Sequence, residues 1–247
     1  MKLSTVNLRR SLHRAITCLG LMIAITGAAF AQETAPQTQV AVSDPSQLVK
    51  QQFKPLFDQV TAQLAKDKQH FLDNPIAYHK FISRTLQPLW DVDSTTSALI
   101  GRKGFEQLDT LQQSELVQAV SDTLIRYAFE GLEYYSGQQF QVVDAVLNQQ
   151  ATLGWIQVLM VSPVIPDITL DVLIKQAEPD IWKAVDVRVK GITYVAVKKH
   201  TFRETIKEQG VTTLITELQQ KNREYFTELC AKTGAAGAAP CAAKAEQ

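Results

Sequence analysis

The sequence predicts an α+β domain in which N-terminal helices and a C-terminal helical pair pack on one curved, four-stranded antiparallel sheet. Two observations support this class. Apolar residues recur at helical spacing up to about Tyr135 and again after Gly191, whereas the segments between them alternate between apolar and polar residues. These alternating segments are joined by short connections, which favour antiparallel neighbours because parallel strands need long crossovers. The order of helices, strands and helices is that of an α+β domain.

Residues 1–31 have the pattern of an export signal. Four basic residues and no acidic one precede an apolar run from Ala15 to Phe30, and Ala29-Phe30-Ala31 has the small-x-small pattern that signal peptidase recognises. The run contains glycine and is shorter than the roughly 20 apolar residues that a membrane span requires. We therefore expect cleavage after Ala31 and export of the chain, to the periplasm in a Gram-negative source.

The charge balance also depends on this segment. The whole chain has 25 basic and 25 acidic residues, which does not favour nucleic-acid binding. Cleavage removes four basic residues and no acidic one, leaving 21 against 25 in a chain of 216 residues. The mature protein is mildly acidic, and this charge favours transient contact with acidic membranes over firm attachment.

The N-terminal helices are expected to start at Asx-Pro pairs. Residues 32–43 are polar and contain proline, so they are expected to form a disordered lead-in. Asp44-Pro45 begins a first helix that extends to about Lys68, and Pro55 inside it should bend or divide the helix. Asn74-Pro75 begins a second helix, which Pro88 ends.

Two further helices precede the strands. Asp93-Ser94-Thr95 is expected to cap a short third helix, which Gly101 closes. The fourth helix has the strongest local pattern, because apolar residues from Leu111 to Tyr135 follow one helical face. Thr110 is its expected N-cap, and Gly137 ends it.

The four expected strands are residues 140–147, 153–161, 168–176 and 181–190. The helical period returns after Gly191, so the domain is expected to span residues 44–222. Residues 223–247 are interpreted as a C-terminal extension that is mostly disordered after a helix-like start.

Cysteine and histidine usage limits the chemistry. Cys230 and Cys241 either close a small disulfide loop in an oxidising compartment or remain two free thiols. No histidine lies near them and the zinc spacings are absent, so no metal site is expected. The mature chain has only three histidines, without a nucleophile elbow or phosphate loop, so we expect no enzyme activity.

Several short motifs stand out by their order and spacing. They are residues 86–92 (LQPLWDV), 99–102 (LIGR), 134–138 (YYSGQ), 182–193 (WKAVDVRVKGIT), 202–206 (FRETI) and 210–215 (GVTTLI). Together they resemble the MlaC family, which is also called the toluene-tolerance family. The resemblance covers about Asp44 to Asn222, with departures at Lys190, where the family usually has an acidic residue, and at Thr193, where it has serine.

The resemblance implies a periplasmic carrier that shuttles glycerophospholipid between the outer and inner membranes and helps maintain lipid asymmetry. It also implies an apolar cavity between the helical and sheet layers, with phospholipid as cargo and no cofactor. The implied partners are an inner-membrane ABC transporter with an MCE-domain subunit and an outer-membrane lipoprotein–porin complex. Two other functions remain open: a periplasmic chaperone or adaptor that binds apolar protein segments, and a hydrolase on a cavity-bearing scaffold.

Candidate lipid-binding residues are apolar positions on the predicted helices and strands, each of which also fits an ordinary core. They are Trp90, Leu99, Ile100, Phe105, Leu124, Ala128, Leu132, Tyr135, Trp155, Leu159, Leu170, Val172, Val185 and Val187. Cationic side chains that would meet a phosphate or an acidic partner, or simply be solvated, are Arg84, Arg102, Lys103, Lys198 and Lys199.

Overall fold

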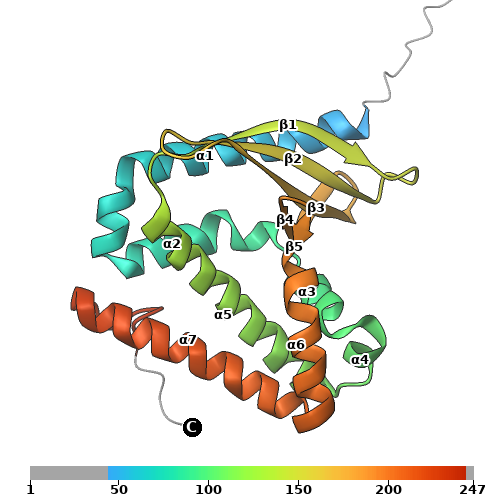
Figure 1. The fold of residues 1–247 in the computed structure, drawn as a ribbon, viewed down its shortest axis with the longest axis vertical. Coiled ribbons are helices and arrows are strands. Elements are labelled where there is room, and N and C mark those ends of the chain that lie inside the picture. Colours follow the sequence, from blue (N-terminus) through green and yellow to red (C-terminus); the bar gives the residue numbers. More distant parts are fainter. Residues whose placement is uncertain (1–43, 243–247) are drawn as a thin grey trace, which may run out of the picture. The chain divides into compact units, whose positions relative to one another are not determined.

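The structure, a computed structural model, describes residues 44–242 (Figure 1). The expected export signal and lead-in, residues 1–43, lie outside the described residues, as do residues 243–247. Within the described part, no helix is both long enough and apolar enough to cross a membrane.

Helices α1 (Pro45–Asp73) and α2 (Pro75–Thr85) begin at the predicted Asx-Pro pairs. The Asp44 carboxylate accepts a hydrogen bond from the Ser46 N–H at 3.0 Å. The Asn74 side chain accepts one from the Ala77 N–H, also at 3.0 Å. Of the two outcomes predicted at Pro55, a bend or a division, the division is wrong, because α1 continues through it. Pro55 is exposed, so the carbonyl that lacks an N–H donor in the preceding turn can be hydrated instead.

Helix α3 is capped by Asp91 and not by the predicted Asp93-Ser94-Thr95, which form its first turn. The Asp91 carboxylate accepts hydrogen bonds from the N–H and the hydroxyl of Ser94, at 2.9 and 2.7 Å. The Asp91 N–H donates to the Ala184 carbonyl at 2.8 Å, and this sheet contact keeps the residue out of the helix. The elements of this segment are η1 (Gln87–Leu89), α3 (Val92–Ile100) and α4 (Arg102–Glu106), of which η1 and α4 were not predicted.

Helix α5 (Thr110–Tyr134) has Asp109 as its N-cap, one residue before the predicted Thr110. Asp109 accepts from the Gln112 N–H at 2.8 Å, and the Gln112 side chain accepts from the Asp109 N–H at 3.3 Å. This capping box satisfies two N–H groups of the first turn. Leu111, the first residue of the predicted apolar face, is 67% exposed, and the buried face begins at Leu116.

The strands form one antiparallel sheet in sequence order, with a short fifth strand that was not predicted. Register shifts mark bulges in β1 near Val143 and in β4 near Val185. The strands are β1 (Gln139–Leu147), β2 (Leu153–Val161), β3 (Ile168–Glu178), β4 (Ile181–Val189) and β5 (Ile192–Thr193). The four long strands match the predicted segments closely, because their alternating pattern reflects a sheet with two different faces.

Helix α1 covers one face of this sheet (Figure 1). Val49 and Phe53 of α1 pack against buried side chains that lie opposite one another across the strands, such as Ile156 and Val172. We call this group the sheet cluster; its buried members are Val49, Phe53, Ala145, Ile156, Val158, Val172, Ile174, Trp182 and Ala184.

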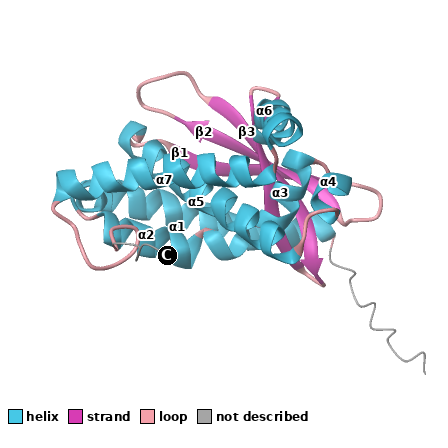
Figure 2. Cartoon of the chain, turned by 90° about the horizontal axis from the view of Figure 1, so that it is seen from below, coloured by secondary structure: helices cyan, strands magenta, loops and turns pink. Residues whose placement is uncertain are grey.

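Most of a second layer is formed by α5 together with the last two helices, α6 (Tyr194–Gln209) and α7 (Val211–Thr233). α6 contacts β4 and β5, whereas α7 packs along α5 (Figure 2). The α6 cluster joins α3, α5, α6 and α7 around Leu99, Leu116, Val120, Phe202 and Leu214. The α2 cluster joins α1, α2 and α5 around Leu64, Phe71, Tyr78, Ile82, Phe129, Leu132 and Tyr135.

The domain boundary predicted after Asn222 is absent, because α7 is continuous from Val211 to Thr233. Tyr225, Phe226 and Leu229 pack against the α2 cluster, so this part of the expected extension belongs to the folded domain. Cys230 and Cys241 form a disulfide that ties the segment 234–241 to the end of α7. We expected most of the extension to be disordered, because a composition rich in alanine and glycine does not indicate that α7 continues or that the two cysteines pair.

The α+β class and the single antiparallel sheet are confirmed. The sheet has five strands and not four, and α6 is the member of the C-terminal helical pair that contacts it, at β4 and β5. α7 is separated from the strands because its apolar face packs against α5 and α2. The fold is therefore a sheet covered by α1 together with a helical layer built on α5 and α7.

Candidate functional site

The sheet cluster and the α2 cluster share α1. The N-terminal half of α1 supplies Val49 and Phe53 to the sheet cluster, and its C-terminal half supplies Leu64 and Phe71 to the α2 cluster. Among residues 44–242, neither α1, β1 nor β2 contributes a buried polar or charged side chain. An apolar ligand inserted where these clusters adjoin would therefore separate apolar groups without leaving a buried polar side chain of these elements unpaired.

A pocket of about 620 Å³ lies at this junction, between α1 and the edge strand β1. Phe140 and Val142 of its lining pack against the sheet cluster, and Tyr135 belongs to the α2 cluster. On α1 the small side chains of Ala62 and Ala65 leave room for a ligand. The lining is Lys54, Asp58, Thr61, Ala62, Ala65, Tyr135, Gly137, Gln139, Phe140, Gln141 and Val142. We call this the α1–β1 pocket.

The charged groups at the α1–β1 pocket, and some of its polar groups, are paired within the protein. The Lys54 ammonium lies 2.7 Å from the Asp58 carboxylate, one helical turn away. The Thr61 hydroxyl accepts a hydrogen bond from the Phe140 N–H at 3.4 Å, which ties α1 to the start of β1. The Lys68 ammonium donates to the Tyr135 carbonyl. The charged part of the lining is thus balanced, and the rest is mostly apolar.

Tyr135 has a buried hydroxyl without a hydrogen-bond partner, although the residue itself lines the pocket. The side chain is 7% exposed, and burial raises the pKa of its hydroxyl. Tyr225, which packs against the same α2 cluster, has a second buried hydroxyl without a partner. Burial, reinforced by Glu133 and Glu130, raises the pKa of Tyr225 to about 12. Each buried hydroxyl without a partner costs about 1–3 kcal/mol of folding free energy. This arrangement of the α2 cluster therefore leaves hydrogen-bonding capacity unused.

The structure places most of the predicted lipid-binding residues in or against the three clusters. Leu99, Ile100, Phe105 and Leu124 lie in or against the α6 cluster. Trp90, Leu170 and Val172 lie in or against the sheet cluster, and Ala128, Leu132 and Tyr135 in or against the α2 cluster. Of all these residues, Tyr135 alone lines the α1–β1 pocket.

The predicted sheet residues lie on both faces of the sheet. Leu170 lies opposite Val158 and Val172 opposite Val187, on the face that α1 covers. Trp155 and Leu159 are on the other face, where the Arg188 guanidinium lies 4.0 Å from the centre of the Trp155 ring. Val185 is buried at the β4 bulge, and its carbonyl accepts from the Thr95 hydroxyl at 2.7 Å. Residues on opposite faces of one sheet cannot line a single cavity on one side of it.

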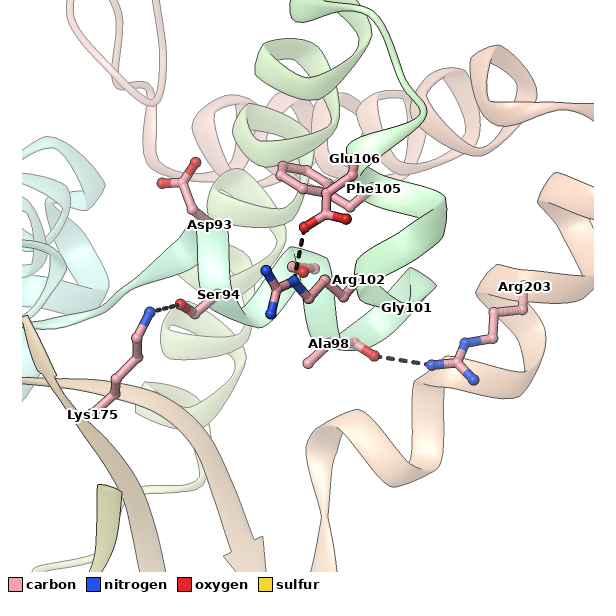
Figure 3. Close-up of a pocket in the computed structure, with 10 residues that line it drawn as sticks. Asp93, Ser94, Ala98, Gly101, Arg102, Phe105, Glu106, Lys175 and Arg203 are labelled. Carbon is pink, nitrogen blue, oxygen red and sulfur yellow. Dashed lines mark hydrogen bonds and ion pairs between the residues drawn. The ribbon is translucent and has the colours of Figure 1, made fainter. Parts of the chain in front are cut away.

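A second hollow, of about 780 Å³, lies among α3, α4, β3 and α6 and is lined by charged groups (Figure 3). The Arg203 guanidinium donates to the carbonyls of Ala98 and Leu99 at 3.3 Å each. The Arg102 guanidinium lies 2.8 Å from the Glu106 carboxylate. The lining is Asp93, Ser94, Ser97, Ala98, Gly101, Arg102, Phe105, Glu106, Lys175 and Arg203. We call this the charged hollow.

Two of the predicted site residues, Arg102 and Phe105, line the charged hollow, although sequence alone did not place them together. Arg84, Lys103 and Lys199 are exposed on the surface outside both hollows. The Lys198 ammonium lies 5.9 Å from the centre of the Tyr127 ring. Lys175 and Arg203 were missed, because their approach to α3 depends on contacts between distant segments.

Thr61, Ala62 and Ala65 of the α1–β1 pocket were also missed. Together with Asp58 they recur at three- and four-residue spacing on α1, which is a sequence signal for one helical face. Small side chains at such positions are compatible with a groove, but only the structure shows that β1 lies opposite them.

The described residues contain no group of three or more His, Cys, Asp or Glu side chains placed to hold a metal ion. His79 lies 3.4 Å from the Ser83 hydroxyl, and burial lowers the pKa of its imidazole against the opposing effect of Asp122. Neither residue lines either hollow. The arrangement at the α1–β1 pocket favours binding of an apolar group over acid–base chemistry.

Comparisons with known proteins agree with this architecture. The sequence profile described as MlaC protein matches residues 54–220. A phospholipid-binding protein from Ralstonia solanacearum, solved in complex with a phospholipid, shares the fold with a TM-score of 0.63 at 21% identity. The alignment covers 74% of this chain and 99% of the Ralstonia chain. No curated protein matches the chain in sequence.

Proposed function

The chain belongs to the MlaC family, and on that premise we propose that it is a periplasmic carrier that shuttles glycerophospholipid between the outer and inner membranes. The family match over residues 54–220 is the observation that carries this proposal. The shared fold with a protein described as phospholipid-binding is consistent with it. In this proposal the carrier helps maintain lipid asymmetry, and the phospholipid is cargo and not a cofactor.

The α1–β1 pocket supports an apolar cargo. Its volume of about 620 Å³ is within the range of about 300–1,000 Å³ found for small-molecule sites. We place the mouth of the lipid site here, with acyl chains entering between the sheet cluster and the α2 cluster. Opening this junction would also release the Tyr135 hydroxyl from its unpaired burial.

The energetics of a carrier differ from those of a tight receptor. Two acyl chains of about sixteen carbons represent more than about 20 kcal/mol of hydrophobic transfer at roughly 0.8 kcal/mol per methylene. The donor membrane offers the same burial, so the protein needs only to match it and to keep the tails from water. The balanced Lys54–Asp58 pair at the pocket gives no strong preference for an anionic or a zwitterionic head group.

The proposed partners are those of the family: an inner-membrane ABC transporter with an MCE-domain subunit and an outer-membrane lipoprotein–porin complex. The carrier itself would bind no nucleotide, because the transporter supplies the energy of ATP hydrolysis. The carrier would then move lipid in the direction that these partners impose.

Native mass spectrometry of the mature protein, purified without detergent, tests the proposal, with solvent extraction to identify any lipid. We expect stoichiometric phospholipid. Leu170→Arg or Val172→Trp should abolish loading while the circular dichroism spectrum stays unchanged, because both side chains lie on the face that α1 covers. Thr169→Arg is the matched control, since Thr169 is exposed on the same strand and should retain lipid. A lipid-free wild-type protein that also takes no lipid from vesicles would contradict the proposal.

The same experiment separates the two other functions. A chaperone or adaptor would copurify with peptide and not with lipid, and a hydrolase would release fatty acid from the vesicles. If Leu170→Arg and Val172→Trp unfold, these positions belong to the ordinary core and their assignment to the lipid site is wrong.

A further inference from the structure

The charged hollow combines cationic groups with an apolar surface in a concave site. Ala98 is exposed and Phe105 is half-buried in its lining, and the side chains of Arg102, Lys175 and Arg203 approach from three different elements (Figure 3). The hollow is separate from the α1–β1 pocket, with which it shares no residue. Lipid binding as proposed above therefore leaves this surface without a role.

Its cations are held in place by the protein. Arg203 donates to the Ala98 and Leu99 carbonyls at the C-terminal end of α3, and no ion pair is recorded for it among residues 44–242. The Lys175 ammonium donates to the Ser94 hydroxyl at 2.9 Å and lies 3.5 Å from the Asp91 carboxylate. Side chains fixed in this way lose little conformational entropy when a partner binds.

The lining of the hollow has three cationic side chains, Arg102, Lys175 and Arg203, and two carboxylates, Asp93 and Glu106. Glu106 is paired with Arg102, and Asp93 lies in the first turn of α3, where the helix dipole stabilises a carboxylate. Arg203 remains as a cation without a carboxylate partner. Lys199 and Lys207 lie four residues before and after it on α6, so they share its helical face and extend the positive surface. This region is positive on a domain whose acidic residues outnumber its basic ones.

We propose that the charged hollow is a docking site for an acidic segment of a partner protein, with carboxylates near Arg203 and Lys175 and an apolar side chain against Ala98 and Phe105. This inference rests on the proposed carrier function, which requires protein partners at both membranes. A concave site suits a protruding protein segment, whereas a bilayer surface is flat and cannot enter it. Complementary charge would speed the encounter and orient the two proteins.

Binding to the two purified partners, the MCE domain of the inner-membrane subunit and the outer-membrane lipoprotein–porin complex, tests the inference by biolayer interferometry. Arg203→Glu should weaken binding to at least one of them by about tenfold or more, and wild-type binding should fall with rising salt. Ala98→Trp should weaken binding similarly, because it fills the hollow without changing charge. Lys80→Glu, an equal charge reversal at an exposed position of α2, should stay within about twofold of wild type.

Arg203 also caps α3, so Lys199→Glu provides a second charge reversal that leaves this contact intact. The inference is wrong if Arg203→Glu, Lys199→Glu and Ala98→Trp all bind like the wild type. It is also wrong if the wild type binds neither of the two partners. Cosedimentation with phosphatidylglycerol vesicles that is lost in Arg203→Glu and matched by unchanged protein binding would assign the surface to membranes instead. Lipid content, measured on every variant, should stay at the wild-type level; a lipid-free wild type would instead contradict the carrier function.

Discussion

Two contacts in the molecule, that of α1 with the sheet and that of α5 with α7, depend on different chemistry. Where α1 covers the sheet, the buried side chains that meet are apolar, as Phe53, Ile156 and Trp182 show. Where α5 meets α7, the buried Asn222 side chain accepts from the Arg126 guanidinium at 3.1 Å and donates to the Ala119 carbonyl at 3.2 Å. Thr123 lies beside them, with its hydroxyl 3.3 Å from the Asn222 amide oxygen.

This difference indicates which contact can open. Apolar side chains that separate around acyl chains exchange one apolar neighbour for another. The hydrogen bonds between α1 and the sheet, such as those of the Gln52 side chain with the Trp182 backbone at 2.8 and 3.1 Å, are only partly buried. Separation of α5 from α7 would break the hydrogen bonds of Asn222 and leave the Arg126 side chain with fewer partners. The α5–α7 contact is therefore the rigid frame, and the contact between α1 and its neighbours is the part suited to admit a ligand.

Removal of apolar volume under α1 should have the largest effect. Phe53 is 2% exposed in the sheet cluster, so Phe53→Ala should lower the free energy of unfolding by about 3–5 kcal/mol in urea denaturation. Val143→Ala, at a β1 position that is 59% exposed, is the control and should change it by less than about 0.5 kcal/mol. A loss below about 1 kcal/mol for Phe53→Ala would show that this cluster is already loosely packed.

The extent to which the sequence predicts the molecule follows from the range of the interactions involved. Strand positions and the helix starts at Asp44 and Asn74 were predicted, because alternation and capping are local signals. The sheet faces were predicted less well: Trp155 and Val172 were placed in one cavity, although the strand register puts them on opposite faces. Faces depend on register and bulges, which the local pattern of each strand does not specify.

The sites were harder to predict than the fold for the same reason. The α1–β1 pocket needs Ala62 opposite Phe140, and the charged hollow needs Arg203 beside Ala98, across 105 residues. The helix between residues 223 and 233 was missed as part of the domain, because its contacts with the α2 cluster outweigh an unpromising composition. Of the residues singled out from local pattern, Tyr135 lines the α1–β1 pocket, and Arg102 and Phe105 line the charged hollow.

The Cys230–Cys241 disulfide should have the next largest effect. It closes a loop of 11 residues, for which the loss of chain entropy in the unfolded state corresponds to about 3 kcal/mol. The double variant Cys230→Ser/Cys241→Ser should therefore unfold at lower urea concentration than the oxidised wild type. Dithiothreitol should lower the wild-type midpoint toward that of the variant and leave the variant unchanged. Equal midpoints for oxidised wild type and variant would show that the end of α7 frays independently of global unfolding.

A polar change in the α5–α7 contact should have a smaller effect on stability and none on loading. Asn222→Ala removes the partner of Arg126 and of the Ala119 carbonyl, and we expect a loss of about 2 kcal/mol. Asn222→Asp keeps the acceptor for Arg126 and should lose less. Lipid content per protein should match the wild type in both variants. A loss of lipid in Asn222→Ala with the fold retained would contradict the assignment of this contact to the rigid frame.

The smallest effect concerns pH at the edge of the charged hollow. Burial tends to raise the pKa of Asp91, but the hydrogen bonds from Ser94 and the charge of Lys175 outweigh it and hold the pKa below its usual value. A carboxyl with a depressed pKa stabilises the folded state above its unfolded pKa, and this contribution is lost as the pH falls through the folded value. Asp91→Asn should therefore be less stable than the wild type at pH 7, and the difference should shrink below about pH 4. Asp93→Asn, in the same turn, is the control; a pH-independent difference for Asp91→Asn would show that Asp91 acts as a helix cap alone, without the charge of Lys175.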